Sequence, residues 1–256
     1  MSIIENFVAL QVTAFMLTFV RLGTAVMLMP GVGDSFVPTN IRLYFALALS
    51  LVLMPIIAMY MPAPVPSGTL LIATIFTEFM IGALIGTVAR ILMSATDTAG
   101  MILSFQTGLS NAQLFNPQMA TQGSLLGAFV SVSAACILFT MDMHHLMIRG
   151  LLESYTLFPF GQMPDSGSMA EVVVKMVLHA FDIAVQMSAP LLITILILYV
   201  SMGVLSKLMP QLQIFMIVMP AQIMLSLLVL ILSFGAMMTF FVSEYTSAIG
   251  SFLGGR

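Results

Sequence analysis

The sequence predicts an all-α integral membrane protein with about six long, kinked hydrophobic helices. Of its 256 residues, 60% are hydrophobic and only 7% are charged, whereas a soluble domain usually carries about 25% charged residues. The mean hydropathy is +1.13, and apolar runs of membrane-spanning length recur along the chain. These runs lack the polar and apolar alternation of lipid-facing β-strands, which excludes a transmembrane β-barrel.

Six apolar segments define the expected helices, and each is near or above the roughly 20 residues that cross a bilayer. They are Phe7–Met29, Leu43–Met61, Leu70–Met93, Gly123–Met141, Ile183–Leu205 and Ile214–Val242. Stretches rich in proline and glycine separate several of them, such as PGVGDSFVP and MPAPVPSG. Proline lacks a backbone donor and glycine costs backbone entropy, so both favour helix ends.

The C-terminal part reads as a two-helix hairpin. Residues 208–243 carry no charge, and this run is too long for one simple span. Pro210 and Pro220 interrupt it, so we expect a short turn, a kink near Pro220 and then a long helix. We therefore divide the chain near Glu171, into residues 1–170 and a hairpin of residues 171–256 with MPQLQIF at its tip.

Composition and motifs exclude several classes of function. The net charge of −3 provides no basic surface for nucleic acid. Cys136 is the single cysteine, so there is no disulfide or cysteine-based metal framework. No nucleophile elbow, P-loop or dinucleotide-binding fingerprint occurs. We expect a protein without enzymatic activity and without a cofactor.

Four charged residues lie within or beside the apolar runs: Arg21, Glu78, Arg90 and Asp182. A charge at the bilayer centre costs about 2.5–3.5 kcal/mol on insertion scales, so such residues face protein or water. Glu78 and Arg90 are too far apart to pair, since they are separated by about 18 Å along one helix. We expect contacts to other helices or subunits, with snorkelling and a transported-ion site as alternatives.

The histidines have a structural and a chemical interpretation. His179 and Asp182 share a helix face, which favours a local or inter-subunit hydrogen bond over a proton relay. Asp142, His144 and His145 could suggest a metal site. Adjacent helical residues point about 100° apart, which suits a shared metal ion badly. We interpret this group as a polar helix end and expect no metal.

The stretch GLSNAQLFNPQMATQ, residues 108–122, is polar but uncharged and lies between long apolar runs. Three interpretations are open: an exposed loop, a re-entrant segment that lines or blocks a water-filled path, and the substrate site of a transporter. Exposed loops usually carry charge, and Leu109, Leu114, Phe115 and Met119 prefer burial. Irregular backbone at membrane depth is tolerated only inside protein or beside a water-filled cavity.

The 25 methionines suggest adaptable packing. Methionine is unbranched and flexible, so it seals irregular or changing gaps. Many of these residues serve as ordinary core filler. As a population, they fit a pore that opens for varied polypeptides and closes again.

Four fragments, taken in order, make the chain resemble the FliR/SctT family of type III export-gate components. They are RLGTAVMLMPGVGDSFVP with Arg42 after it, SFQTGLSNAQLFNP, MDMHHLMIRGLLESYTLFPFG and VLSKLMPQLQIFMIVMP. Met143 departs from the family pattern, which has a small residue, often glycine, before the histidine pair.

The resemblance implies one copy of this chain assembled with several FliP-like and FliQ-like subunits into a closed helical cone. FlhB and FlhA would join this cone beneath the flagellar basal body, in the bacterial inner membrane, where this chain is a multi-pass subunit. Residues 1–170 would be the FliP-like part and residues 171–256 the FliQ-like hairpin. Unfolded flagellar proteins would pass through the channel, and membrane lipid would contact some of the helices.

The resemblance also implies roles for individual residues. It places a pore plug at residues 108–122, with Phe115 as the apolar stopper and Met119 as a gasket. The residues expected at the plug or gate are Gln106, Gly108, Leu114, Phe115, Asn116, Pro117 and Met119. Those expected at contacts with other subunits are Arg21, Glu78, Arg90, Asp182, Lys207, Pro210, Gln211 and Phe215. Lys207 and the hairpin tip would meet FliQ-like hairpins or FlhB.

Two alternative functions remain at this point. One is an injectisome homologue for virulence secretion, although the MDMHH and LFPFG fragments favour the flagellar branch. The other is a stand-alone secondary transporter, which broken helices near Pro210 and Pro220 would suit. No pair of similar half-segments supports the transporter, and an intramembrane hydrolase lacks any catalytic constellation.

Overall fold

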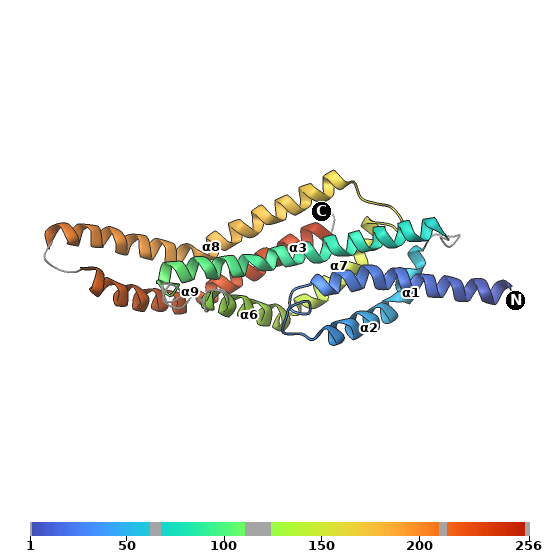
Figure 1. The fold of residues 1–256 in the computed structure, drawn as a ribbon, viewed down its shortest axis with the longest axis horizontal. Coiled ribbons are helices and arrows are strands. Elements are labelled where there is room, and N and C mark those ends of the chain that lie inside the picture. Colours follow the sequence, from blue (N-terminus) through green and yellow to red (C-terminus); the bar gives the residue numbers. More distant parts are fainter. Residues whose placement is uncertain (1, 62–67, 111–123, 210–213, 254–256) are drawn as a thin grey trace. The chain divides into compact units, whose positions relative to one another are not determined.

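The protein is described by a computed structural model that covers residues 2–61, 68–110, 124–209 and 214–253. Within these ranges the regular elements are helices, which confirms the predicted all-α class (Figure 1). They are α1 (Ser2–Leu28), α2 (Thr39–Ile57), the short 3-10 helix η1 (Ala58–Tyr60), α3 (Thr69–Thr107), α6 (Leu125–Thr140), α7 (Met143–Leu157), α8 (Ser166–Leu208) and α9 (Ile214–Leu253).

Five of these helices are long and apolar enough to cross a membrane, and the pair α6 and α7 can count as a sixth span. Three are more than ten residues longer than the apolar segments from which they were predicted. The α3 helix continues past Met93 to Thr107, α8 begins at Ser166 instead of near Ile183, and α9 reaches Leu253. The α9 helix runs through Pro220.

The fourth predicted span differs most from the structure. The α6 helix has only 16 residues, too few for a straight crossing, and it meets α7 at an angle of 73°. The bend occurs at Asp142, whose φ of 58° lies in the left-handed region. That conformation is uncommon for a residue other than glycine and cannot continue a right-handed helix.

The chain forms two compact units. The first contains residues 1–92, 139–177 and 246–256, and the second contains residues 93–138 and 178–245. Each unit takes segments from both sides of Glu171, and the division into a FliP-like part and a FliQ-like hairpin stays a prediction. The two helices expected for the C-terminal hairpin are present as α8 and α9.

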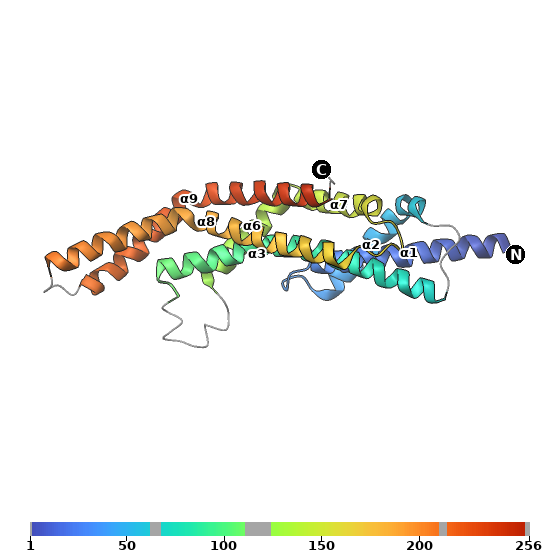
Figure 2. The ribbon, with the colours of Figure 1, turned by 90° about the horizontal axis from the view of Figure 1, so that it is seen from above.

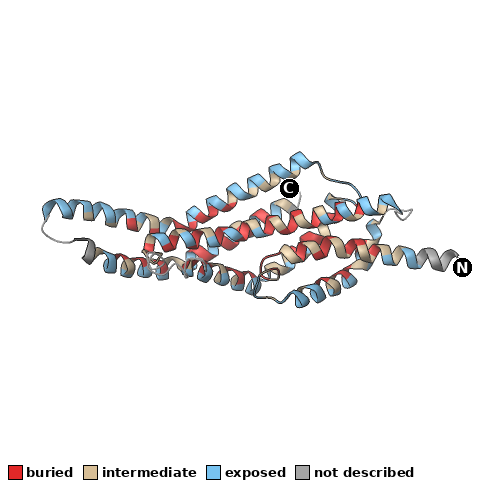
Figure 3. Cartoon of the chain, viewed as in Figure 1, coloured by how far each residue is buried: buried red, intermediate tan, exposed pale blue. Residues whose placement is uncertain are grey.

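The first unit has its core between α1 and its neighbours. The α1 and α2 helices lie side by side (Figure 1), and the middle of α1 is buried (Figure 3). Glycines on α3 let its backbone approach α1 closely. A Cβ atom on Gly86 would lie 2.8 Å from the carbonyl oxygen of Ala25, so a larger residue would force the helices apart.

Arg42 organises the loop between α1 and α2. Its guanidinium group donates hydrogen bonds to the carbonyl oxygens of Gly33 at 3.1 Å, Asp34 at 2.9 Å and Val37 at 2.7 Å. The Asp34 carboxylate accepts a hydrogen bond from the Gly31 N–H at 2.7 Å. These bonds provide partners for backbone groups of the loop, which have no helical hydrogen bonds.

In the second unit, α8 and α9 run side by side as a hairpin (Figures 1 and 2). Gln222 on α9 donates a hydrogen bond to the Tyr199 hydroxyl on α8 at 3.1 Å. Phe129 on α6 packs against Phe234 on α9, with ring centroids 5.4 Å apart.

Candidate functional site

The α3 helix ends where the uncharged stretch begins. Gly108 has a φ of 78°, a conformation that glycine adopts without the strain a side chain would bring. The N–H groups of Gly108 and Ser110 return to the carbonyl oxygens of Phe105 and Ser104, at 3.2 and 3.3 Å. This is the glycine-terminated end typical of α-helices, and it stops α3 after Thr107.

The chain re-enters helix α6 at a point that also contacts α3. Ser124 caps α6, because its hydroxyl oxygen accepts the Gly127 N–H at 3.0 Å. The same hydroxyl donates a hydrogen bond to the Gly100 carbonyl oxygen on α3 at 3.3 Å. Gly108, the first residue of the uncharged stretch, and Ser124, two residues after its end, therefore both contact α3.

Gln222 ties the end of α3 to the hairpin. Its amide nitrogen donates to the Gln106 carbonyl oxygen at 2.8 Å and to the Tyr199 hydroxyl at 3.1 Å. Only 8% of Gln222 is exposed. Gln106 lies in the last turn of α3, where carbonyl groups lack intrahelical partners, so the amide satisfies one of them.

A cavity of about 190 Å³ lies beside this junction. Residues that line it include Phe105, Gly108, Tyr199, Met202, Met219 and Gln222. The lining combines flexible methionines with amide and hydroxyl groups and has no charge, so it can adapt in shape without binding an ion tightly.

Several residues expected at the gate or the hairpin tip lie outside the described residues. These are Leu114, Phe115, Asn116, Pro117, Met119, Pro210 and Gln211. Phe215 belongs to α9 by its backbone. Among the described ones, Gln106 and Gly108 lie together at the end of α3, and Lys207 is exposed in the last turn of α8. Sequence reasoning missed Gln222, although a glutamine within an apolar run was a signal for it.

Arg21 and Glu78 form a buried ion pair in the first unit. The Arg21 Nε and Nη2 atoms donate to the two Glu78 carboxylate oxygens, at 2.6 and 3.0 Å. Neither side chain has exposed surface. The contact expected with another helix is therefore made inside the chain, and no surface of either residue is left for a neighbouring subunit.

Residues of α7 and the segment after it complete the surroundings of Arg21. Its Nη1 atom donates to the Ser154 carbonyl and hydroxyl oxygens, both at 3.3 Å, and its Nη2 atom to the Phe158 carbonyl oxygen at 2.9 Å. The Tyr155 ring lies 3.9 Å from the guanidinium carbon, as in a cation–π contact. The fragment SYTLFPFG thus supplies the pocket for Arg21.

The other charged residues have weaker or exposed partners. Arg90 lies 3.8 Å from the Asp34 carboxylate, and half of its side chain is exposed. Asp182 is exposed and accepts a hydrogen bond from Gln186 at 2.8 Å. His179 lies 3.4 Å from Glu244 on α9, so its charged neighbour comes from the other hairpin helix.

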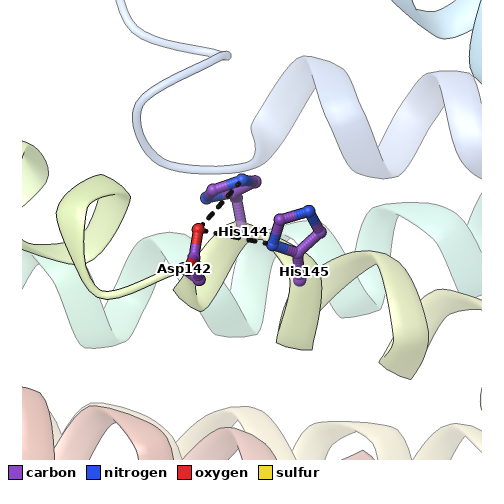
Figure 4. A group of neighbouring side chains, drawn as sticks. All are labelled: Asp142, His144 and His145. Atoms are coloured by element: carbon purple, nitrogen blue, oxygen red, sulfur yellow. Dashed lines mark ion pairs between the residues drawn. The ribbon is translucent and has the colours of Figure 1, made fainter.

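The residues at the bend between α6 and α7 lie closer together than helical periodicity predicts (Figure 4). The Asp142 Oδ1 atom is 3.5 Å from His145 Nδ1 and 3.9 Å from His144 Nε2. The centroids of the two imidazole rings are 4.1 Å apart. Asp142 precedes the helix, so the angular spacing of helical residues does not set its direction.

Comparison with known proteins gives consistent similarities. A family profile described as "Bacterial export proteins, family 1" matches residues 12–248. The flagellar biosynthetic protein FliR of Caulobacter vibrioides is 36% identical over 246 residues, 95% of this chain and 97% of that protein. FliR of Bacillus subtilis is 29% identical over 85% of each chain. The Yop proteins translocation protein T of Yersinia pestis is 28% identical over 72% of this chain and 71% of its own length.

Proposed function

The chain belongs to family 1 of the bacterial export proteins, and we propose that it is a subunit of the flagellar type III export gate. With FliP-like and FliQ-like subunits it forms the channel that carries unfolded flagellar proteins across the inner membrane. The chain forms part of the channel wall through which these proteins pass, and it does not act as an enzyme. FlhB and FlhA are the further partners of this assembly.

One observation carries the flagellar assignment. Similarity to a flagellar biosynthetic protein extends over 95% of the chain at 36% identity, whereas the injectisome relative is 28% identical over 72%. Because the chain is also similar to the Yop proteins translocation protein T, injectisome secretion stays as the alternative function.

Deletion of the gene separates the two functions. The flagellar assignment predicts cells without motility and without hook or filament protein in the medium, and the intact gene on a plasmid restores both. A motile deletion strain that instead stops releasing effector proteins would establish the alternative.

Helix length supports assembly with other subunits. The 43 residues of α8 span about 64 Å at the α-helical rise of about 1.5 Å per residue. The hydrocarbon core of a bilayer is only about 30 Å thick. Exposed residues lie near both ends of α8 (Figure 3). Among the large apolar ones, Val174 is 57% and Leu208 is 73% exposed. Lipid covers part of this surface, and partner subunits cover the rest.

We further propose that residues 108–122 plug the closed channel. The stretch is uncharged, and hydrogen bonds hold Gly108 at its start and Ser124, two residues beyond its end, on α3. A plug must leave the path and return to it, and a segment attached at two points can do so without unfolding the helices. Phe115 and Met119 are the residues that restrict leakage in this proposal.

Deletion of residues 110–122 is expected to raise ion leakage through the assembled gate, measured as conductance in planar bilayers. A second variant replaces the same residues with an equally long glycine and serine linker, which keeps the connection but removes Phe115 and Met119. Both variants should leak if the apolar side chains make the seal. Unchanged conductance in both, with assembly verified by co-purification, would remove the plug role.

A further inference from the structure

We propose that Asp142, His144 and His145 bind one divalent transition-metal ion of the zinc class. The three residues lie at the bend between α6 and α7 (Figure 4). Each offers one ligand atom, and these atoms all lie within 4.8 Å of one another.

The distances fit ligands of a shared ion better than direct hydrogen bonds. The Asp142 oxygen is 3.5 Å from His145 Nδ1 and 3.9 Å from His144 Nε2. Hydrogen bonds between nitrogen and oxygen usually measure about 2.7–3.2 Å. Two ligands that each lie about 2.1 Å from a tetrahedral zinc ion are about 3.4 Å apart. Small side-chain rotations would bring all three atoms to that spacing.

The ligand types select the class of ion. Two imidazole nitrogens and a carboxylate favour zinc and its neighbours in the first transition row, whereas magnesium and calcium prefer oxygen ligands. Three protein ligands leave a position open for water or for a group from another molecule.

The surroundings orient the ligands and leave a route for the ion. The His144 ring packs on Phe139, with centroids 5.5 Å apart. Its Nδ1 atom is buried, so Nε2 is the nitrogen that can reach an ion. The side chains of Asp142 and His145 are 76% and 71% exposed, so an ion can enter from solution. The Asp142 carboxylate offsets the unfavourable field that the N-terminus of α7 exerts on a cation.

Occupation of this site would connect the bend to the first turn of α7. Asp142 lies at the bend itself, and both histidines lie within the helix that follows. A shared ion would therefore fasten the Asp142 side chain to the first turn of α7, where the His145 N–H already donates a hydrogen bond to the Asp142 carbonyl oxygen at 3.0 Å.

Histidine labelling tests the proposal on the full-length chain. Solubilised membranes, washed with chelator, are treated with diethyl pyrocarbonate at increasing Zn²⁺ concentrations, and each histidine is read by mass spectrometry. Zn²⁺ is expected to protect His145 and His144 at concentrations that leave His179 reactive. Mg²⁺ at the same concentrations should protect none of them. The chain has three histidines, so His179 serves as the internal control.

The D142N variant keeps both histidines but weakens one ligand. Since even outer-shell partners are worth about 10–100-fold in metal affinity, the Zn²⁺ concentration for half-protection should rise at least about tenfold. D165N is the matched control, because Asp165 is also exposed, and it should behave as the unchanged chain. If D142N is not recovered folded, H145A with His144 as the readout decides by the same criterion. Equal protection of all three histidines, or no shift in the ligand variant, would overturn the proposal.

Discussion

A fully buried arginine and glutamate in an oily chain show how single residues constrain this fold. Burying either charge alone would cost several kcal/mol, because the low-dielectric interior replaces water. Arg21 and Glu78 offset this cost through two parallel hydrogen bonds, and two backbone carbonyl oxygens and the Ser154 hydroxyl oxygen accept the remaining guanidinium donors. The pair joins α1 to α3, and hydrogen bonds from Arg21 to Ser154 also join α7 to them.

At the residue scale we predict that E78Q strongly destabilises the protein. The substitution leaves Arg21 charged and without its counter-ion, which costs about 3–5 kcal/mol when a buried pair loses one partner. The double variant R21L/E78L should recover much of this loss, because it buries no charge. Thermal unfolding of the complex co-purified with FliP-like and FliQ-like subunits, followed by a fluorescent dye, measures all three forms.

The exposed pair of Arg149 and Glu153 provides the control for this prediction. The Arg149 Nε atom lies 2.9 Å from a Glu153 carboxylate oxygen, but 78% of the arginine side chain is exposed. E153Q should change stability by only about 0.3–0.5 kcal/mol, as for other exposed pairs on one helix. An E78Q protein as stable as E153Q would show that the buried pair does not hold these helices together.

At the element scale, the close approach of α3 and α6 depends on glycine at position 100. A Cβ atom on Gly100 would lie 2.7 Å from the backbone nitrogen of Gly127 and 2.9 Å from the Leu126 carbonyl oxygen. Backbone atoms cannot move aside as a flexible side chain can. Glycine at position 100 therefore permits the hydrogen bond from Ser124 to α3.

We predict that G100A destabilises the protein by about 1–3 kcal/mol, the usual cost of overpacking. It should also raise channel leakage, because the attachment of the uncharged stretch is displaced. G203A is the matched control, since a Cβ atom on Gly203 would meet nothing within 4 Å. Alanine there should stabilise α8 by about 0.5–1 kcal/mol through helix propensity. Equal melting temperatures of the two variants would contradict the close-approach explanation.

At the scale of the whole molecule, many large apolar side chains are exposed on helices longer than a bilayer is thick. Exposed residues occur along α2, α8 and α9 (Figure 3), and many of them are large and apolar. The α3, α8 and α9 helices each have 39 to 43 residues, about twice the length that crosses a bilayer. Contiguous apolar surface of this extent marks an interaction site or an aggregation risk.

We predict that the chain expressed alone is unstable or aggregates in detergent, whereas co-expression with FliP-like and FliQ-like subunits yields a defined complex. Size-exclusion chromatography with light scattering measures both preparations, and the mass of the complex counts the copies. A chain that is monodisperse alone and moves a small solute in vesicles would support the transporter alternative instead.

The sequence by itself determined the all-α class and the position of the apolar helices, because hydropathy and helix breakers act over short stretches of chain. It also identified Arg21 and Glu78 as charged residues that needed partners, and the family resemblance singled out Gln106. It could not pair Arg21 with Glu78 or Gln106 with Gln222, since these partners are 57 and 116 positions apart. The bend at Asp142 and the extension of α3 to Thr107 likewise came only from tertiary structure. The partner of a buried charge and the point where a helix ends depend on which segments contact one another in the folded chain. The linear pattern of polar and apolar residues does not specify those contacts.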